Sequence, residues 1–264
     1  MDEQAILALV QSVVEVQYGQ TDCSFVSLNT RSLDDERIIY KMFRVNTPGN
    51  SWIAFAAHDD LISGRTFRWE TFLSPRRWLE QRATLLNILA EEHYPAPRII
   101  PSLRGNLVTS EGPWHMLVTT FLDGQTGGIS SEHLGLLAST LGRLHSLPIP
   151  KEPPIGFSRW NRAYSIPHAL EALEQVRGDV PTSHRDLYQQ CQQALLMVET
   201  YLESATYVLT HGDCWGPNSV HMGSQEVVLI DWEGAGQGAA ILDFGSLVLT
   251  CQYDQWGGIP PFQV

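Results

Sequence analysis

The sequence predicts an α+β protein with two lobes, a small β-rich N-terminal lobe and a larger, mainly helical C-terminal lobe. Three observations lead to this fold class. Short runs rich in β-branched and aromatic residues crowd the chain before residue 60. Helical periodicity dominates the second half, for example over 183–203. The glycine-rich stretch GQTGG lies between these regions and is typical of a hinge, so we expect lobes at residues 1–122 and 123–264.

The N-terminal lobe should begin with a helix and continue as a mixed β-sheet. Apolar residues at helical spacing predict a leading helix over 3–16. A second helix is expected over 75–93, where Pro95 and Pro97 stop it. The turn sequence TPGN favours an antiparallel hairpin between the second and third strands. The predicted strands cover residues 24–28, 37–46, 51–58, 98–101, 106–108 and 114–121.

The C-terminal lobe should contain two long helices and one hairpin. The first helix is expected over 130–147, with a weakly formed capping box in Ser131 and His133. The second is amphipathic and covers 183–203, whereas the segment 148–182 has no clear periodicity. A turn cluster between two β-branched runs predicts a β-hairpin farther along the chain, with strands over 219–222 and 227–230.

The net charge argues against nucleic acids as partners and restricts the charge of a bound acceptor. The net charge is −12 and the pI is about 5.1, which argues against a nucleic-acid binder because phosphate backbones are bound by Lys and Arg clusters. After Arg185 the last 79 residues contain nine acids and no Lys or Arg, so an acceptor bound there should be neutral or cationic. No stretch approaches the roughly 20 apolar residues of a membrane span, and the N-terminus lacks a basic leader. We expect a cytoplasmic protein that does not bind membranes.

The stretch from Tyr207 to Asp231 carries the strongest chemical signal. It places Asp213, Asn218 and Asp231 around the predicted hairpin, with spacings of 218 − 213 = 5 and 231 − 213 = 18. The hairpin should bring Asn218 and Asp231 together. One carboxylate could then take the proton of an acceptor hydroxyl, while an amide and a second carboxylate hold Mg²⁺ against nucleotide phosphates. This set predicts a magnesium-dependent phosphoryl transferase.

Two other strings resemble protein-kinase motifs but have the wrong context. The string His184 to Leu187 spells a catalytic-loop signature, yet it lies in a helical pattern and Cys191 stands where a magnesium ligand is needed. The string Asp243 to Gly245 spells a metal motif, but it lies 243 − 213 = 30 residues after Asp213, too far for strand–turn–strand delivery. Asp231 is therefore the better metal ligand.

HGDCWGPN, followed by VVLIDWE and LDFGSL, resembles the catalytic segment of the aminoglycoside phosphotransferase and choline kinase superfamily. The stretch LEQRATLLNILAEEHYPAPRII is similar to its αC helix, VTTFLDG to its hinge and LGRLHSLP to a helix of its second lobe. The resemblance implies a protein-kinase-like bilobal fold and ATP as phosphoryl donor. It implies Asp213 as catalytic base, Asn218 and Asp231 as Mg²⁺ ligands, and adenine binding by backbone groups of Phe121 and Leu122.

The resemblance also implies structural roles for two further residues near this segment. His211 should hold the catalytic loop in place. Asp243 should accept hydrogen bonds from loop amides, because a buried carboxylate needs partners.

The sequence departs from the family pattern in the N-terminal lobe. Phe55 stands where a phosphate-binding Lys or Arg is usual, so Lys41 or Arg44 would have to replace it. Arg82 falls near the αC position usually held by glutamate, and a small shift of register would place Glu80 there instead. The loop 29–36 also lacks glycine. At the other end the chain stops within twenty residues of LDFGSL, which leaves a truncated C-terminal lobe as one interpretation.

Together these features predict an ATP- and Mg²⁺-dependent O-phosphotransferase that acts on a hydroxyl of a small molecule. The acceptor stays open between an aminoglycoside, a choline-like or amino alcohol, and a sugar. The alternative is a catalytically inactive kinase-like module that binds or regulates. Trp215 and Trp232 either line the acceptor pocket or pack in the core, and core packing is the commoner role of such residues.

Overall fold

The computed structural model describes residues 2–32, 38–61, 74–127, 130–149, 165–223 and 225–250. The chain divides into two compact units, one formed by Met1–Thr126 with Val220–Ile230 and the other by Gly127–Ser219 with Asp231–Val264. The first unit therefore includes a segment from the second half of the sequence. The predicted lobes 1–122 and 123–264 stay a prediction.

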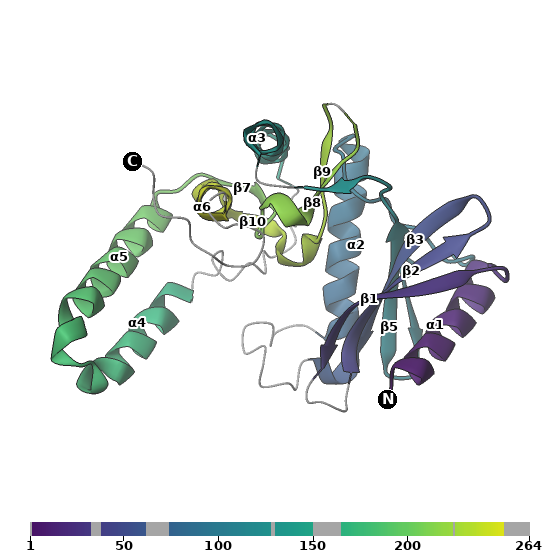
Figure 1. Ribbon diagram of the computed structural model, residues 1–264, viewed down its shortest axis with the longest axis horizontal. Helices are drawn as coiled ribbons and strands as arrows, with labels where there is room; N and C mark the ends of the chain where they lie inside the picture. Colours follow the sequence, from purple (N-terminus) through teal and green to yellow (C-terminus); the bar gives the residue numbers. More distant parts are fainter. Residues whose placement is uncertain are drawn as a thin grey trace. The chain divides into compact units, whose positions relative to one another are not determined.

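The first unit is built on a five-stranded sheet with the order β1-β2-β3-β5-β4 (Figure 1). The strands are β1 Ser24–Ser32, β2 Ile38–Thr47, β3 Asn50–His58, β4 Val108–Glu111 and β5 Trp114–Thr120. All neighbouring strands are antiparallel, so the expectation of a mixed sheet was wrong. The chain reaches the edge at β4 and returns by a hairpin into β5, and β5 runs antiparallel to both β4 and β3. The predicted strand over 98–101 contributes only the isolated bridge Ile99–Thr119.

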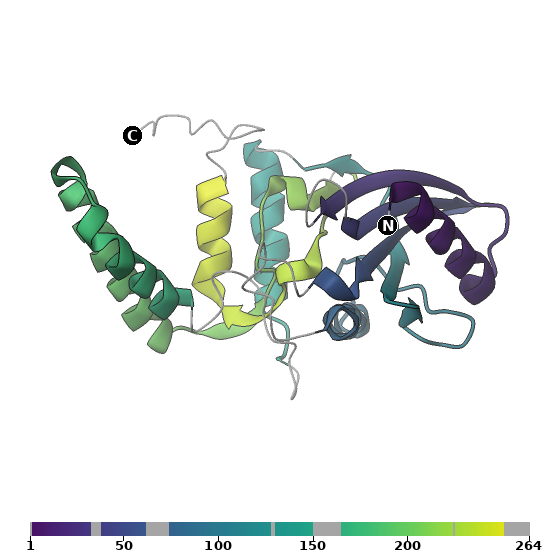
Figure 2. The ribbon, with the colours of Figure 1, turned by 90° about the horizontal axis from the view of Figure 1, so that it is seen from below.

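Helices α1 (Glu3–Tyr18) and α2 (Pro75–Glu91) cover opposite faces of this sheet (Figures 1 and 2). α1 is capped at its start by Asp2, whose carboxylate accepts a hydrogen bond from the Ala5 amide at 2.8 Å, and at its end by Gly19 with φ 70°. Its apolar side packs against alternate sheet residues, which all lie on one face because side chains alternate along a strand. The buried cluster on this face includes Ile6, Val10, Val13, Val14, Phe43, Val45, Ala54, Ala56, Met116 and Val118.

A small three-stranded sheet contains the predicted hairpin. Its order is β6-β8-β9, with β6 Gln125–Thr126, β8 Ser219–His221 and β9 Val227–Leu229. The Met222 amide donates to the Glu226 carbonyl at 2.9 Å across the turn. The hairpin predicted over 219–222 and 227–230 is thus confirmed, and Asn218 and Asp231 flank its two open ends.

The second unit combines helices with the antiparallel pair β7 (Tyr207–Thr210) and β10 (Gly236–Ala239). Its helices are α3 Ser131–His145, α4 Ser165–Val176, α5 Arg185–Glu203 and α6 Ala240–Thr250. α3 is capped by Ser130, which accepts from the His133 amide at 3.2 Å, so the cap lies one residue before the predicted Ser131. One short 3-10 turn, Asp59–Leu61, lies in the first unit. The 3-10 turns of the second unit are Arg177–Asp179, Thr182–His184, Gly216–Asn218 and Trp232–Gly234. No helix of the described residues is both long and apolar enough to cross a membrane.

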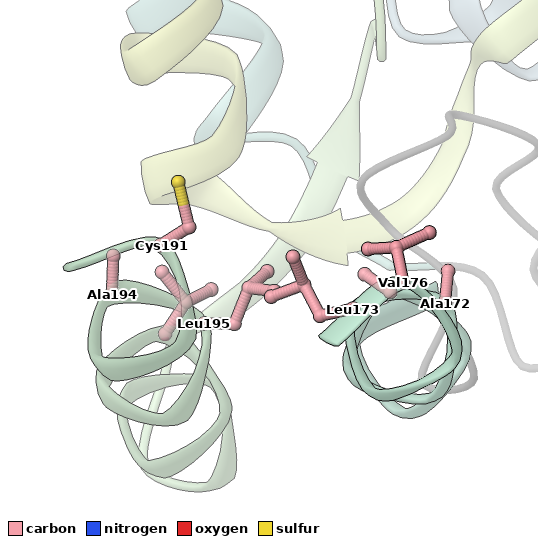
Figure 3. A pocket seen from close by; sticks show the side chains of 8 residues that line it. Ala172, Leu173, Val176, Cys191, Ala194 and Leu195 are labelled. Atoms are coloured by element: carbon pink, nitrogen blue, oxygen red, sulfur yellow. The ribbon is translucent and has the colours of Figure 1, made fainter. Parts of the chain in front are cut away.

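The helices α4 and α5 form a hairpin with an open apolar groove of about 660 Å³ between them (Figure 3). Its walls carry aliphatic side chains and one thiol and lack charged groups. This groove has no chemistry for binding phosphate or a metal ion. The lining residues are Ala169, Ala172, Leu173, Val176, Cys191, Ala194, Leu195 and Val198.

Candidate active site

The loop that follows β7 brings together two of the three predicted site residues, the base Asp213 and the metal ligand Asn218. Asn218 ends the 3-10 turn Gly216–Asn218, and its Nδ2 donates to Asp213 Oδ2 at 2.7 Å and to the Asp213 carbonyl at 3.1 Å. Asp213 is exposed and Asn218 is half-buried. The amide therefore orients a solvent-accessible carboxylate, which is what a general base requires.

Asp243 holds the backbone just before Asp213. It lies in α6 and is 1% exposed, and its Oδ2 and Oδ1 accept hydrogen bonds from the amides of His211 at 2.8 Å and Gly212 at 2.7 Å. His145 of α3 places Nε2 3.0 Å from the same Oδ2. The predicted role of Asp243 as an acceptor for loop amides is confirmed.

His211 links this loop to the segment after Asp231. Its buried ring packs edge-on against Trp232, with 4.6 Å between ring centroids and an interplanar angle of 66°. Trp232 is 2% exposed and packs in the core of the second unit. Trp215 is half-buried.

Asp231 adopts a backbone conformation that is uncommon for a side-chain-bearing residue. Its φ and ψ are 61° and 56°, in the left-handed region, immediately before the 3-10 turn Trp232–Gly234. Left-handed geometry costs a residue with a Cβ about 1–2 kcal/mol, less for Asp than for most, and such strain collects at functional sites. Among the non-glycine residues that the structure describes, Asp231 shares a positive φ with His93.

Pairing of β7 with β10 brings the Asp231 segment beside the Asp213 loop. Thr210 at the end of β7 is opposite Gly236 at the start of β10. Farther along, a Cβ placed on Gly234 would lie 3.5 Å from the Gly212 backbone. The chain after β7 and the chain before β10 therefore run in close contact, and they carry the two candidate carboxylates.

Asn218 and Asp231 offer an amide oxygen and a carboxylate, which are the hard oxygen donors that Mg²⁺ prefers. Among the residues that the structure describes, no three His, Cys, Asp or Glu side chains form a metal-binding group. Mg²⁺ in phosphoryl transferases is often held by one or two protein ligands with substrate phosphates completing the shell. The donor set fits a metal of that kind, one that arrives with a nucleotide.

Three residues that support the loop were missed from the sequence. His133 was interpreted as part of a helix cap, but its Nε2 lies 2.8 Å from Ser219 Oγ, and that hydroxyl donates to the Gly216 carbonyl at 2.5 Å. The Gly127 amide donates to the Ser219 carbonyl at 2.8 Å, and a Cβ on Gly127 would collide with His133, Ser219 and Gly216. The GG pair in GQTGG was the available signal, and it was interpreted only as a hinge.

In the first unit, the structure restricts what the predicted adenine site can offer. The Phe121 amide already donates to the Ser51 carbonyl at 2.9 Å, so the Phe121 carbonyl is its remaining polar backbone group for a base. The Arg44 guanidinium carbon lies 3.9 Å from the centre of the Phe121 ring, and Arg44 Nε donates to Asn46 Oδ1 at 2.9 Å. Leu122 follows β5 and is half-buried.

Lys41 does not fit the predicted replacement for the missing basic residue. It pairs with Ala56 in the sheet register and therefore lies on the α1 face, whereas Phe55 pairs with Met42 and lies on the α2 face. Lys41 is 2% exposed, and its Nζ forms an ion pair with Glu3 of α1 at 2.8 Å. Since it is on the wrong face and occupied, the hypothesis that Lys41 takes over from Phe55 is wrong.

Comparisons with known proteins identify the architecture. Solved structures that resemble the chain include amicoumacin kinase hAmiN in complex with AMP-PNP, Ca²⁺ and Ami, with a TM-score of 0.64, 16% identity, and coverage of 100% of this chain and 72% of that one. The Plasmodium vivax ethanolamine kinase matches with a TM-score of 0.62, 13% identity, and 95% and 68% coverage. Spectinomycin phosphotransferase in complex with ADP and spectinomycin matches with a TM-score of 0.58, 13% identity, and 89% and 71% coverage. Curated protein sequences give no match.

These structural matches show a kinase-like α+β fold, as the sequence predicted. The model of the Phosphotransferase enzyme family matches residues 72–261, which is more than half of the chain and includes the whole Asp213 loop and Asp231. The chain therefore belongs to the phosphotransferase enzyme family.

Proposed function

We propose that the protein is an ATP-dependent O-phosphotransferase that transfers a phosphoryl group to a hydroxyl of a small neutral or cationic molecule. The observation that carries this proposal is the exposed Asp213 carboxylate, which is oriented by Asn218 at 2.7 Å. Its backbone is held by the buried Asp243. A residue that served only as a turn or cap would not need this support.

In the proposed mechanism, Asp213 accepts the proton of the acceptor hydroxyl as that oxygen attacks the terminal phosphorus. The hydrogen bond from Asn218 Nδ2 keeps the carboxylate in one orientation and leaves Asn218 Oδ1 to bind a cation. Asn218 and Asp231 would hold Mg²⁺, which when bound offsets the negative charge of the phosphates. The backbone of Phe121 and Leu122 would bind adenine.

The acceptor class follows from charge. The last 79 residues contain nine acids and no Lys or Arg, which favours a neutral or cationic acceptor over an anionic one. Similar structures carry the names of kinases for amicoumacin, ethanolamine and spectinomycin, and these names suggest the first acceptors to try. Aminoglycosides, amino alcohols and sugars belong in the same panel.

The test is acceptor-dependent consumption of ATP with Mg²⁺ across this panel, in the parent and in two variants. Asp213→Asn should lower turnover by about 10²- to 10⁴-fold, the usual contribution of a general base, and leave binding of Mg-ATP nearly unchanged. The matched control is Asp186→Asn, which removes the exposed aspartate of the misleading string at the start of α5 and should keep parental turnover. Equal losses in both variants would contradict the role of Asp213.

The inactive-module alternative also has a specific observation in its favour, because Phe55 stands at a position where the family usually has a basic residue. This alternative predicts a protein that consumes no ATP with any acceptor and whose melting temperature does not respond to Mg-ATP. A ligand that binds only the folded state raises the melting temperature by mass action. A Mg²⁺-dependent rise with ATP would therefore argue against it.

A further inference from the structure

The residue Phe55 lies between the sheet and α2, on the face away from α1. In the register of the sheet it is opposite Met42 of β2 and Leu117 of β5. Its neighbours Ala54 and Ala56 belong to the cluster that packs against α1, so Phe55 points to the other face. Phe55 is 6% exposed.

The helix α2 places a guanidinium directly on this ring. Arg82 Cζ lies 3.9 Å from the centre of the Phe55 ring, and Arg82 is also 6% exposed. Arg remains protonated in proteins, so this contact fixes a permanent positive charge at the β3 position. The aromatic face stabilises the cation and sets the plane of the guanidinium.

The alternative register, in which Glu80 would face the sheet, does not occur. Glu80 is exposed, and its Oε1 accepts from Arg76 Nε one helical turn earlier at 2.8 Å. Trp78 instead packs edge-on against Tyr40, with 6.2 Å between ring centroids, which fixes the rotation of α2 on the sheet. Arg82 is thereby the α2 side chain opposite Phe55.

Protein kinases pair a Lys on this strand with a Glu on the facing helix, and the Lys binds nucleotide phosphate. In this chain the strand has an aromatic ring and the helix has the cation. The two positions therefore still supply one cationic side chain, but it comes from the helix, and the partner carboxylate is absent from both positions.

On the assumption that the proposed function holds, we propose that Arg82, supported by Phe55, binds the phosphates of the nucleotide in place of the absent strand lysine. The planar guanidinium can donate two parallel hydrogen bonds to phosphate oxygens, which Lys cannot do. Arg44 stacks on Phe121 just after β5, and Lys41 faces α1. Of these three described cations, Arg82 is the one that lies over the ring of Phe55.

Titration calorimetry with ATP, ADP and adenosine tests this role. Arg82→Met keeps the length of the side chain and removes its charge, and we expect ATP and ADP to bind about 10- to 100-fold more weakly, the range for a lost charge-assisted hydrogen bond. Adenosine, which has no phosphate, should bind as in the parent. Arg76→Met removes an exposed Arg of the same helix and should bind ATP like the parent.

A double variant keeps the test decisive if Arg82→Met does not fold. Phe55→Lys combined with Arg82→Glu restores the strand cation and helix anion, and we expect it to bind ATP within about threefold of the parent, well inside the tenfold loss that one charge-assisted bond represents. Phe55→Lys alone places two cations together and should lower the melting temperature. Failure of the double variant to bind ATP would overturn the proposal.

The outcomes separate this inference from the proposed function. If the parent binds ATP and Arg82→Met binds it equally well, Arg82 has no phosphate role and the proposed function is untouched. If Arg82→Met loses adenosine as strongly as ATP, its effect is structural and the inference is overturned. If the parent binds neither ATP nor ADP, the proposed function fails and the inference fails with it.

Discussion

Replacing Asp243 with Asn should loosen the loop that carries Asp213. The carboxylate accepts hydrogen bonds from the amides of His211 and Gly212 at 2.8 and 2.7 Å, and Asp243 is 1% exposed. An Asn side chain has one acceptor oxygen, and its NH₂ group would face the second amide. With its oxygen at the Oδ2 position, Asn keeps the contacts to the His211 amide and to His145 Nε2, so one charge-assisted bond is lost and the Gly212 amide is left unsatisfied.

The expected size follows from this count. A hydrogen bond to a charged group contributes about 1.5–3 kcal/mol, and about 1.4 kcal/mol corresponds to a tenfold change in an equilibrium. The loop should open about 10- to 100-fold more often. Hydrogen exchange of a peptide that covers residues 206–214 should become faster by that factor in Asp243→Asn, while exchange in α1 stays unchanged.

The matched control is Glu174→Gln in α4, which removes one partner of an exposed pair with Arg177. Surface pairs of this kind contribute little to stability, so exchange in the Asp213 loop should not change. If Asp243→Asn and Glu174→Gln exchange alike over residues 206–214, the hydrogen bonds of Asp243 do not hold the loop. That result would also remove the support that the backbone before Asp213 is inferred to receive from Asp243.

Three further predictions concern other parts of the molecule. Gly127→Ala should destabilise the protein by about 1–3 kcal/mol through overpacking. Gly142→Ala, on the open side of α3, should stabilise it slightly. Opposite shifts in melting temperature would verify this contrast. Asp231→Gly should melt at a temperature no lower than the parent, because left-handed strain is relieved. The variant should nevertheless lose the Mg²⁺-dependent stabilisation by ATP. A rise in melting temperature with Mg²⁺ and ATP equal to that of the parent would contradict the metal role. The hydrogen bond from Lys41, with a further bond from Ser27, holds the pKa of Glu3 below 4.5. Glu3→Gln should therefore lower stability at neutral pH, and this loss should vanish as the pH falls through the lowered pKa of Glu3. A difference in melting temperature between variant and parent that does not depend on pH would refute this.

The chemistry of the site was accessible from the sequence because it depends on local spacing. Asp213 and Asn218 are five residues apart within one turn, and the structure shows them in contact at 2.7 Å. The family resemblance, together with the requirement that a buried carboxylate find donors, predicted the role of Asp243 as an acceptor for loop amides. Turn residues between β-branched runs predicted the hairpin of β8 and β9.

Tertiary structure decided which face of the five-stranded sheet each helix covers. Alternation along β2 and β3 places Lys41 and Phe55 on opposite faces, but only the packing of α1 and α2 shows which face each helix covers. A shift of one residue in register would exchange the two faces, and the sequence alone does not specify the register that closely.

The same reason explains the contacts that bring together residues far apart in sequence. The ring of Phe55 beneath Arg82 depends on the rotation of α2, and the bond from His133 to Ser219 spans 86 residues. Local propensity contains no information on such pairs, because they form only when whole elements pack. The sequence by itself therefore determined the Asp213–Asn218 contact and the hairpin beside it, and the packing of helices on the sheet decided where the positive charges of Lys41 and Arg82 lie.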